Sequence, residues 1–382
     1  MNPHAIINDE SYIKALDSIR RVDEKGYLYE MECDYDYYSL PEQFKLYLSA
    51  GCSTFFTKNL EGEYMLCRNY DYGHYFMNDR HNERTGLNVI VKGNNPKAKY
   101  KSIGVGDAYW LDYKNGMIKE GMADDGKSDL SAFVMMPFLC MDGINEKGLG
   151  VSIMALVNRV EWEEIEYEGA ETKVPEFDEL YVLENKDETP DPLYLHGREG
   201  SIAVNNTDKK AWIAHMTTND TTMPGKPPII PPIMMRMMLD NCANVDEAVA
   251  FADGFNMKSV VPGSDYHIML VDESGKSRLL EWVDNRMNVI DINHATNYRV
   301  STEDGFHGKC GRDECIKAGL YRTQKGGMRE DFAKNLLSLI AQDPTNGNDK
   351  GKTQYSCIYH LKSKTMKIYS FGDFEKSFDY NL

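Results

Sequence analysis

The alternation of apolar and polar positions changes along the chain, from helical spacing near the start to strand-like spacing after residue 51. Residues 11–24 carry apolar side chains at helical intervals, and Gly26 ends that pattern. Residues 27–35 alternate as in a strand. Pro41 suits the first position of a second helix, which is predicted to run to Gly51. The first 51 residues therefore form a distinct preface.

Strand patterns predominate from residue 52 onward. Strands are predicted at 87–91, 100–105, 148–157, 180–183, 267–272, 278–282 and 288–292, with hairpins over 201–215 and 356–370. Helices are predicted at 232–241, 245–253 and 331–342, residues 129–138 fit either a short helix or a strand, and residues 142–148 read as a turn. This order favours sheets with helices packed outside them.

Two segments interrupt the regular pattern. Residues 158–200 are rich in Glu, Asp and Pro, and residues 224–232 are rich in Pro. We expect the first to be a surface excursion and the second a connector.

Composition argues against several classes of protein, namely nucleic-acid-binding, secreted, membrane-spanning and zinc-binding proteins. The chain has 382 residues, of which 42% are hydrophobic, and 60 acidic against 43 basic residues give a net charge of -17. An acidic balance without a basic run argues against a nucleic-acid partner. The N-terminus lacks the pattern of a secretory signal, and no apolar run approaches the roughly 20 residues of a membrane span. The eight cysteines contain no CxxC pair and no zinc spacing. These features predict a cytoplasmic protein without a metal or cofactor.

The most informative stretch runs from residue 50 to 72. It reads as a hairpin that carries Cys52 on its first strand and Arg68 and Asp71 on its second. With a loop at residues 59–61, the residue numbers of each cross-strand pair add up to 120. This register would place Cys52 directly opposite Arg68. A guanidinium so close to a thiol favours the thiolate. Asp71 at the strand end is expected to join them.

A cysteine nucleophile also needs a base. The nine histidines are scattered, and none has the surroundings of a papain-like or caspase-like histidine. If the chain were cut between Gly51 and Cys52, the freed α-amine of Cys52 could take the thiol proton, because α-amines titrate near pH 8. The other reading of Cys52 is a small buried core residue.

The order and spacing of several motifs resemble those of the choloylglycine hydrolase and penicillin V acylase family of N-terminal-nucleophile hydrolases. G-C-S-T-F at 51–55 is followed by R-N-Y-D at 68–71, D-G-I-N-E-K-G-L-G at 142–150, L-L-E-W-V-D at 279–284, H-A-T-N at 294–297 and G-R-D-E at 311–314. The resemblance covers residues 51–382. The preface resembles the pro-segment of acid-ceramidase-like relatives.

The resemblance implies an α+β fold, an αββα sandwich of two antiparallel sheets between helical layers. It implies a pro-segment at 1–51, removed or cleaved autocatalytically, and a catalytic domain at 52–382. The pro-segment could stay associated after the cut, and self-association of the protein is left open.

The resemblance also assigns roles in the site. Cys52 is the nucleophile and the new N-terminus, released by cleavage after Gly51, and Arg68 and Asp71 tune it. Asn297 donates to the oxyanion and Arg312 supports the charge network. The family's other oxyanion residue falls at Ala155 by counting, so either the loop is longer here, with Asn158 as a weaker candidate, or that oxyanion donor is a backbone N–H. Taken alone, Asn297 could be a turn residue and Arg312 a surface arginine in a Gly-rich loop.

The activity implied is hydrolysis of a linear amide C–N bond in a small N-acyl substrate through an acyl-enzyme on Cys52. Bile-salt conjugates, penicillin V, and N-acyl amino acids or amines all fit this chemistry. Two alternatives remain open: an acyltransferase of the penicillin-biosynthetic type, and an uncut, non-catalytic binding protein of the same fold.

Overall fold

Two stacked β-sheets organise the molecule. The structure is a computed structural model, and it describes residues 10–40, 51–72, 75–76, 79–83, 87–111, 122–156, 160–166, 180–183, 185–190, 200–216, 218–259, 265–283, 285–302, 310–342 and 353–382. Residues from both sheets form one continuous core between them. The apolar run of each strand is therefore buried against the facing sheet.

The first sheet has six antiparallel strands in the order β20-β3-β4-β21-β22-β23. Its strands are β20 (His294–Ala295), β3 (Gly51–Lys58), β4 (Tyr64–Asp71), β21 (Thr353–His360), β22 (Thr365–Ser370) and β23 (Ser377–Asn381). The predicted C-terminal hairpin is confirmed as β21 and β22. The sheet places the start of β3 beside the end of β20.

The second sheet has nine strands in the order β1-β2-β7-β8-β9-β10-β17-β18-β19. These are β1 (Arg20–Arg21), β2 (Leu28–Cys33), β7 (Asn88–Gly93), β8 (Ser102–Asp107), β9 (Cys140–Asn145), β10 (Gly150–Ala155), β17 (Tyr266–Val271), β18 (Ser277–Val283) and β19 (Arg286–Ile290). All pairs are antiparallel except β2 and β7. The prediction of a turn over 142–148 is wrong at its start, because Asp142 to Asn145 belong to β9 and the chain turns only after Asn145.

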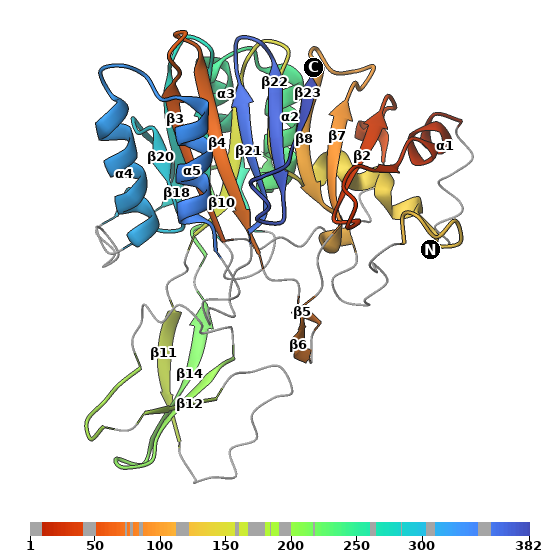
Figure 1. The fold of residues 1–382 in the computed structure, drawn as a ribbon. Helices are drawn as coiled ribbons and strands as arrows, with labels where there is room; N and C mark the ends of the chain where they lie inside the picture. The colour runs from red at the N-terminus through yellow and green to blue at the C-terminus, as the bar shows by residue number, and fades with distance from the viewer. Residues whose placement is uncertain are drawn as a thin grey trace.

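Helices cover the outer face of each sheet (Figure 1). On the six-stranded sheet, α4 (Gly311–Thr323) and α5 (Glu330–Ile340) enclose a second core. On the nine-stranded sheet lie α2 (Pro231–Asn241) and α3 (Val245–Asp253). The order of layers is helix, sheet, sheet, helix, so the predicted α+β sandwich is confirmed.

Local sequence sets the helix boundaries as expected. Pro231 and Pro232 open α2, where a missing N–H costs nothing. Asn244 caps α3 by accepting from the N–H of Glu247, whose carboxylate accepts in return from the N–H of Ala243. The undecided segment 129–138 is largely 3-10 helix, from Ser131 to Leu139. A further 3-10 turn, Ala108–Leu111, follows β8.

The preface is built into the nine-stranded sheet. Its helix α1 (Glu10–Asp17) is shorter than predicted, because the chain enters β1 at Arg20. Strand β2 runs parallel to β7 and is mostly buried. After a 3-10 turn at Tyr37–Ser39, the predicted second helix falls on 41–50, outside the described residues.

A separate four-stranded sheet, β11-β14-β13-β12, lies away from the sandwich (Figure 1). Its strands are β11 (Val160–Ile165), β12 (Leu180–Leu183), β13 (Ile202–Asn205) and β14 (Lys210–Met216), and the last two confirm the predicted hairpin. Two-stranded sheets form from β15 (Pro228–Ile229) with β16 (Asn256–Met257) and from β5 (Tyr75–Phe76) with β6 (Asp79–Glu83).

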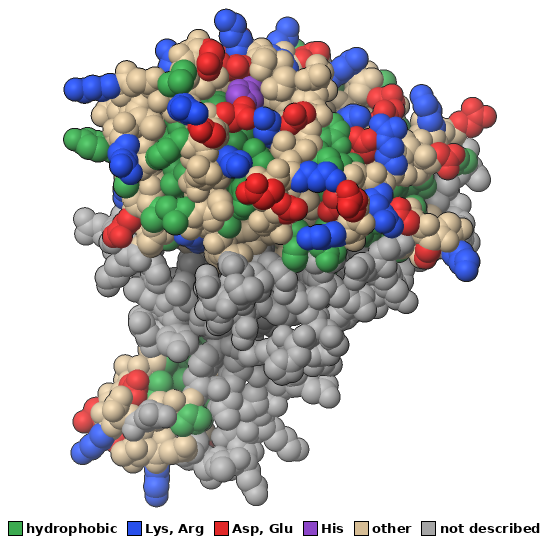
Figure 2. Space-filling view, in the orientation of Figure 1, with side chains coloured by type: hydrophobic (Ala, Val, Ile, Leu, Met, Phe, Trp, Pro, Cys, Tyr) green, Lys and Arg blue, Asp and Glu red, His purple; other side chains and the backbone are tan. Residues whose placement is uncertain are grey.

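Charged side chains of both signs are interspersed over the visible face of the sandwich (Figure 2). No helix among the described residues is both long enough and apolar enough to span a membrane.

Candidate active site

The hairpin of β3 and β4 places Cys52 and Arg68 on one face, in a register that differs from the prediction. The loop spans residues 59–63, with the N–H of Asn59 donating to the carbonyl of Glu63 at 2.7 Å, and Gly62 supplies a positive φ of 88°. Because this loop is two residues longer than predicted, Cys52 pairs with Tyr70 and Arg68 with Thr54. The two side chains are diagonal neighbours, not direct partners. A two-residue shift preserves the face, so their contact survives.

Each polar atom of Cys52 has its own partner. The backbone N–H donates to Oδ1 of Asn297 at 2.8 Å, and the carbonyl oxygen accepts from Nη1 of Arg312 at 3.1 Å. The thiol sulfur lies 3.1 Å from Nη2 of Arg68. Cys52 itself is 0% exposed. Two residues distant in sequence, Asn297 and Arg312, and one from the same hairpin, Arg68, thus fix the position of Cys52.

The short strand β20 explains why side chains hold the backbone of Cys52. Its ladder with β3 consists of His294 with Phe55 and Ala295 with Thr54, and it ends before Cys52. The N–H and C=O of Cys52 would lack a strand partner at this edge, and a buried unpaired backbone group is costly. Asn297 and Arg312 supply the missing partners.

Arg68 connects the two sheets. It is fully buried, and its Nε lies 2.6 Å from the carboxylate of Asp142 on β9, while its Nη1 donates to the hydroxyl of Ser152 on β10. Asp142 and Ser152 are cross-strand neighbours on the facing sheet. The guanidinium therefore spans the core from this pair to the thiol of Cys52.

The Asp142 carboxylate is itself fully satisfied. Two hydroxyls of β21 donate to it, from Tyr355 at 2.7 Å and from Tyr359. Burial raises the pKa of the Asp142 carboxyl, whereas the Arg68 guanidinium and these hydroxyls act in the opposite direction. The ion pair and these hydroxyls form one buried network, in which removing one member would leave the others unpaired.

Burial dominates the protonation of the cysteine in the uncut chain. It raises the pKa of the Cys52 thiol to about 11, although the Arg68 guanidinium acts to lower that pKa. The expected contact between Arg68 and the sulfur is present, but in this state the desolvation cost exceeds the gain from the Arg68 and Arg312 cations, so the thiolate is not favoured. At neutral pH the thiol keeps its proton and needs a base.

Asp71 reaches Cys52 through Arg312. It pairs with Gly51 across the hairpin, and its carboxylate lies 2.9 Å from Nη1 of Arg312 and accepts from the hydroxyl of Thr353 at 2.6 Å. Burial raises the pKa of the Asp71 carboxyl, with Arg312 acting against it. Since Nη1 of Arg312 also donates to the carbonyl of Cys52, one nitrogen links both residues.

Arg312 lies in the first turn of α4, a helix that the sequence patterns did not predict. The alternative reading, an arginine in a Gly-rich surface loop, is wrong. Asp313, which follows, is fully buried and holds His294 of β20 at 3.2 Å and Lys317 at 2.6 Å. This contact fastens the start of α4 to β20 and so brings Arg312 next to Asn297.

Contacts with Cys52, Arg312 and Ala155 orient the side chain of Asn297. Its Oδ1 accepts from Cys52 and from Nη2 of Arg312 at 2.8 Å, and its Nδ2 donates to the carbonyl of Ala155 at 2.6 Å. In this arrangement its carbonyl oxygen, not its amide nitrogen, faces Cys52. Ala155, at which the sequence resemblance placed a second oxyanion position by counting, thus contacts Asn297, while Asn158 lies outside the described residues.

Sequence reasoning missed four members of this network. These are Asp142, Ser152, Tyr355 and Tyr359. The two tyrosines could have been found from the sequence pattern, because residues 355 and 359 lie four apart in a predicted strand and therefore point to the same face of its sheet. Asp142 was hidden by the prediction of a turn there. Among the described residues, no group of three or more His, Cys, Asp or Glu side chains is arranged to hold a metal ion.

No family model and no curated protein sequence matches the chain. Its structure is similar to two variant structures of conjugated bile acid hydrolase from Clostridium perfringens, which are 14% and 13% identical with TM-scores of 0.46 and 0.45. These matches cover 87% and 86% of this chain and 92% of each hydrolase. Penicillin V acylase from Agrobacterium tumefaciens is 13% identical with a TM-score of 0.37, over 84% of this chain and 83% of that one. At such identity the function has to be argued from the site itself.

Proposed function

We propose that this chain is a cysteine amidase that cuts itself between Gly51 and Cys52 and then hydrolyses a linear amide C–N bond of an N-acyl substrate. The observation that carries the proposal is the separate fixing of the nitrogen, carbonyl and sulfur of Cys52. A cysteine that only filled core space would need no such partners for its sulfur. An N-terminal nucleophile needs its amine and thiol held together.

In the self-cleavage step, the Cys52 thiol attacks the carbonyl carbon of Gly51. The C–N bond breaks, the nitrogen of Cys52 keeps its hydrogen and gains the thiol proton, and a thioester joins Gly51 to the sulfur. Water then hydrolyses the thioester, leaving a carboxylate on Gly51 and a free thiol. The contact with Asn297 already holds the departing nitrogen.

After the cut, we expect the preface to remain bound. Strand β2 pairs with β7 along its whole length, Tyr37 donates to Asp240 of α2 at 2.8 Å, and Tyr35 donates to the carbonyl of Val134. Loss of this segment would expose the buried apolar face of β2. The active protein would therefore contain two chains, 1–51 and 52–382.

In each later cycle, the free α-amine takes the thiol proton and the sulfur attacks the acyl carbonyl. The amine product leaves with that proton, and water releases the acid from the thioester. Asn297, carried over as oxyanion donor by resemblance, would have to use its Nδ2, which in the uncut chain donates to Ala155. Its Oδ1 supports a second role, accepting a hydrogen bond from the freed amine.

A substrate panel tests the proposal. Purified protein should release amine from at least one member of a set of bile-salt conjugates, penicillin V, N-acyl amino acids and N-acylethanolamines. A competing amine added to the reaction distinguishes acyl transfer from hydrolysis by its acylated product. A full-length protein that turns over none of them would favour a non-catalytic binding role.

The pH profile should identify the base. Because the buried thiol is protonated at neutral pH, we expect kcat/KM to rise as pH increases from 6 to roughly 8, where the α-amine loses its proton, and then to level off. Activity that stayed constant from pH 6 to 9 would instead indicate a thiolate already formed beside Arg68 and would contradict the role of the α-amine.

Replacing Arg312 should disturb three contacts at once. Arg312→Gln is expected to lower kcat by roughly 10²-fold, because the carbonyl of Cys52, Asn297 and the buried Asp71 lose a shared donor. Arg312→Lys should recover little, since a lysine cannot reproduce the fork of donors. The control is Arg322→Gln in the exposed last turn of the same helix. Equal activity in the Arg312 and Arg322 variants would show that Arg312 does not contribute to the reaction.

A further inference from the structure

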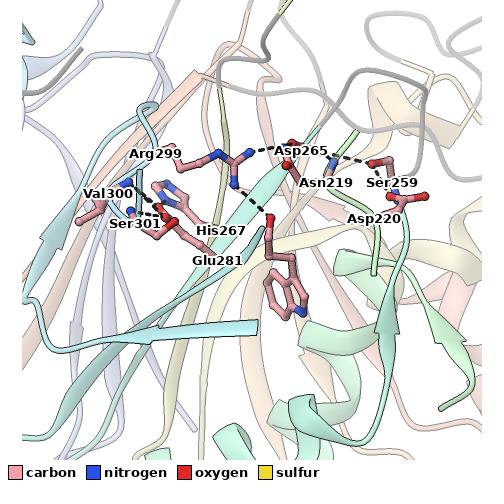
Figure 3. Close-up of polar contacts among 10 residues, drawn as sticks. Asn219, Asp220, Ser259, Asp265, His267, Glu281, Arg299, Val300 and Ser301 are labelled. Atoms are coloured by element: carbon pink, nitrogen blue, oxygen red, sulfur yellow. Dashed lines mark hydrogen bonds and ion pairs between the residues drawn. The ribbon is translucent and has the colours of Figure 1, made fainter. Parts of the chain in front are cut away.

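A buried histidine and glutamate lie next to the segment that contains Asn297, and neither has a role in the mechanism proposed above. His267 on β17 and Glu281 on β18 are direct cross-strand partners, both 0% exposed, with Nδ1 of His267 3.0 Å from the Glu281 carboxylate. The other ring nitrogen, Nε2, lies 2.7 Å from the carbonyl oxygen of Thr296. Figure 3 shows His267 and Glu281 beside Val300 and Ser301, with the Glu281 carboxylate joined to both by dashed lines.

Both ring nitrogens of His267 face acceptors. A neutral imidazole has one donor and one acceptor nitrogen, so it can satisfy only one of these two contacts. The ring that satisfies both carries a proton on each nitrogen and a positive charge, compensated by Glu281. The contact in turn helps to lower the pKa of the Glu281 carboxyl to about 2, against the effect of burial.

His267 and Glu281 form hydrogen bonds with both ends of the segment 296–301, which contains Asn297. His267 holds the carbonyl of Thr296, and the Glu281 carboxylate accepts from the N–H groups of Val300, at 2.9 Å, and Ser301, at 2.8 Å. The segment has little regular structure to fix it otherwise. Its conformation therefore depends on side-chain contacts.

A second buried ion pair anchors the segment from the other side (Figure 3). Arg299 donates to Asp265 at 2.7 Å and to the carbonyl of Trp282 at 3.2 Å. The carbonyl of Asp265 accepts from the N–H of Leu156, next to the Ala155 that holds Nδ2 of Asn297. Asn297 is thus fixed through its own backbone and through its acceptor.

We propose that His267, as an imidazolium paired with Glu281, is a positioning residue that fixes Thr296 and thereby aims Asn297 at the nitrogen of Cys52. The catalytic consequence rests on the proposed function, whereas the structural consequence does not. A hydrogen bond of 2.8 Å tolerates little displacement, and a shift of about 1 Å at a reacting group can cost about 10²-fold in rate.

The structural consequence is tested without activity. In a Cys52→Ala background, which stays uncut, His267→Gln is compared with His360→Gln, another histidine paired with a glutamate but remote from the site. Amide hydrogen exchange of the peptides that cover position 52 and residues 296–301 should accelerate by about tenfold or more in the first variant only. Unchanged exchange in these peptides, or equal acceleration in the control, would overturn the proposal.

Two further measurements, one by NMR and one by enzyme kinetics, test the role of His267 independently of hydrogen exchange. If the His267→Gln protein does not fold, 15N-histidine NMR of the otherwise unaltered chain decides: two protonated ring nitrogens on His267 support the proposal, and a neutral ring overturns it. In the active protein, His267→Gln should lower kcat by roughly 10- to 100-fold with KM changed less than about threefold, and should have no further effect when Asn297→Ala is present. Additive losses would contradict action through Asn297. If the wild-type protein hydrolysed no amide, the proposed amidase function would be contradicted, but the structural role of His267 would not.

Discussion

Cys52→Ala is expected to leave the chain uncut and to reduce amide hydrolysis by about 10⁴-fold or more, to the limit of detection. The side chain supplies the bond-forming atom in both reactions, so nothing nearby can replace it. Cys67, on the neighbouring strand β4, faces the other side of the sheet and is buried against α4 and α5. Cys357 on β21 pairs with Arg68 and shares its face, but burial raises the pKa of the Cys357 thiol well above its usual value. Cys52→Ser keeps the shape of the side chain but offers a weaker nucleophile, and we expect it to be severely impaired.

Cys67→Ala is the matched control for this experiment. It also removes a fully buried thiol from the same hairpin, but on the opposite face from Arg68. This variant should process and hydrolyse normally apart from a modest loss of stability. Amidase activity that survived in Cys52→Ala at the level of the Cys67→Ala protein would exclude Cys52 as the nucleophile.

Asp142→Ala is expected to lower the free energy of unfolding by about 3–5 kcal/mol, the largest stability effect predicted for this chain. The substitution leaves the guanidinium of Arg68 in the core without its counter-ion and removes the acceptor of Tyr355 and Tyr359. Asp142→Asn keeps the volume but not the charge, so it should fall between wild type and Asp142→Ala. Urea unfolding followed by circular dichroism measures the difference.

The control for Asp142 is an exposed ion pair. Asp246→Ala on α3 removes a carboxylate that lies 2.6 Å from Lys276 and is 75% exposed, so it should change the unfolding midpoint little. An Asp142→Ala protein as stable as the Asp246→Ala protein would mean that Arg68 finds another partner. Thiol reactivity of Cys52 in the Asp142 variants would then show whether Arg68 still reaches the sulfur.

Much of the fold was predictable because its strands are apolar and β-branched runs bounded by turn residues, and its helices carry local boundary signals. The helix α3 begins and ends as predicted, since Asn244 caps it and Asp253 precedes a glycine. In contrast, α4 was missed because its amphipathic pattern is weak and its first residues, Gly311 and Arg312, read as a loop. Its position comes from the buried contact between Asp313 and His294, which no local pattern reveals.

The candidate site was predictable only where residues are near one another in sequence or carry a motif. The hairpin brought Cys52 and Arg68 to one face even though the loop length, and therefore the register, was wrong. The long-range partner Asp142 depends on how two sheets stack, and the protonation of Cys52 depends on burial. Neither quantity is encoded in the spacing of residues along the chain.

Mass spectrometry of the purified wild-type protein under denaturing conditions shows whether the chain cuts itself between Gly51 and Cys52. Self-cleavage predicts two polypeptides that co-purify, one comprising residues 1–51 and one beginning at Cys52, and a single full-length mass for Cys52→Ala. Wild-type protein that remains full length after prolonged incubation, or that is cut at any other bond, would contradict it.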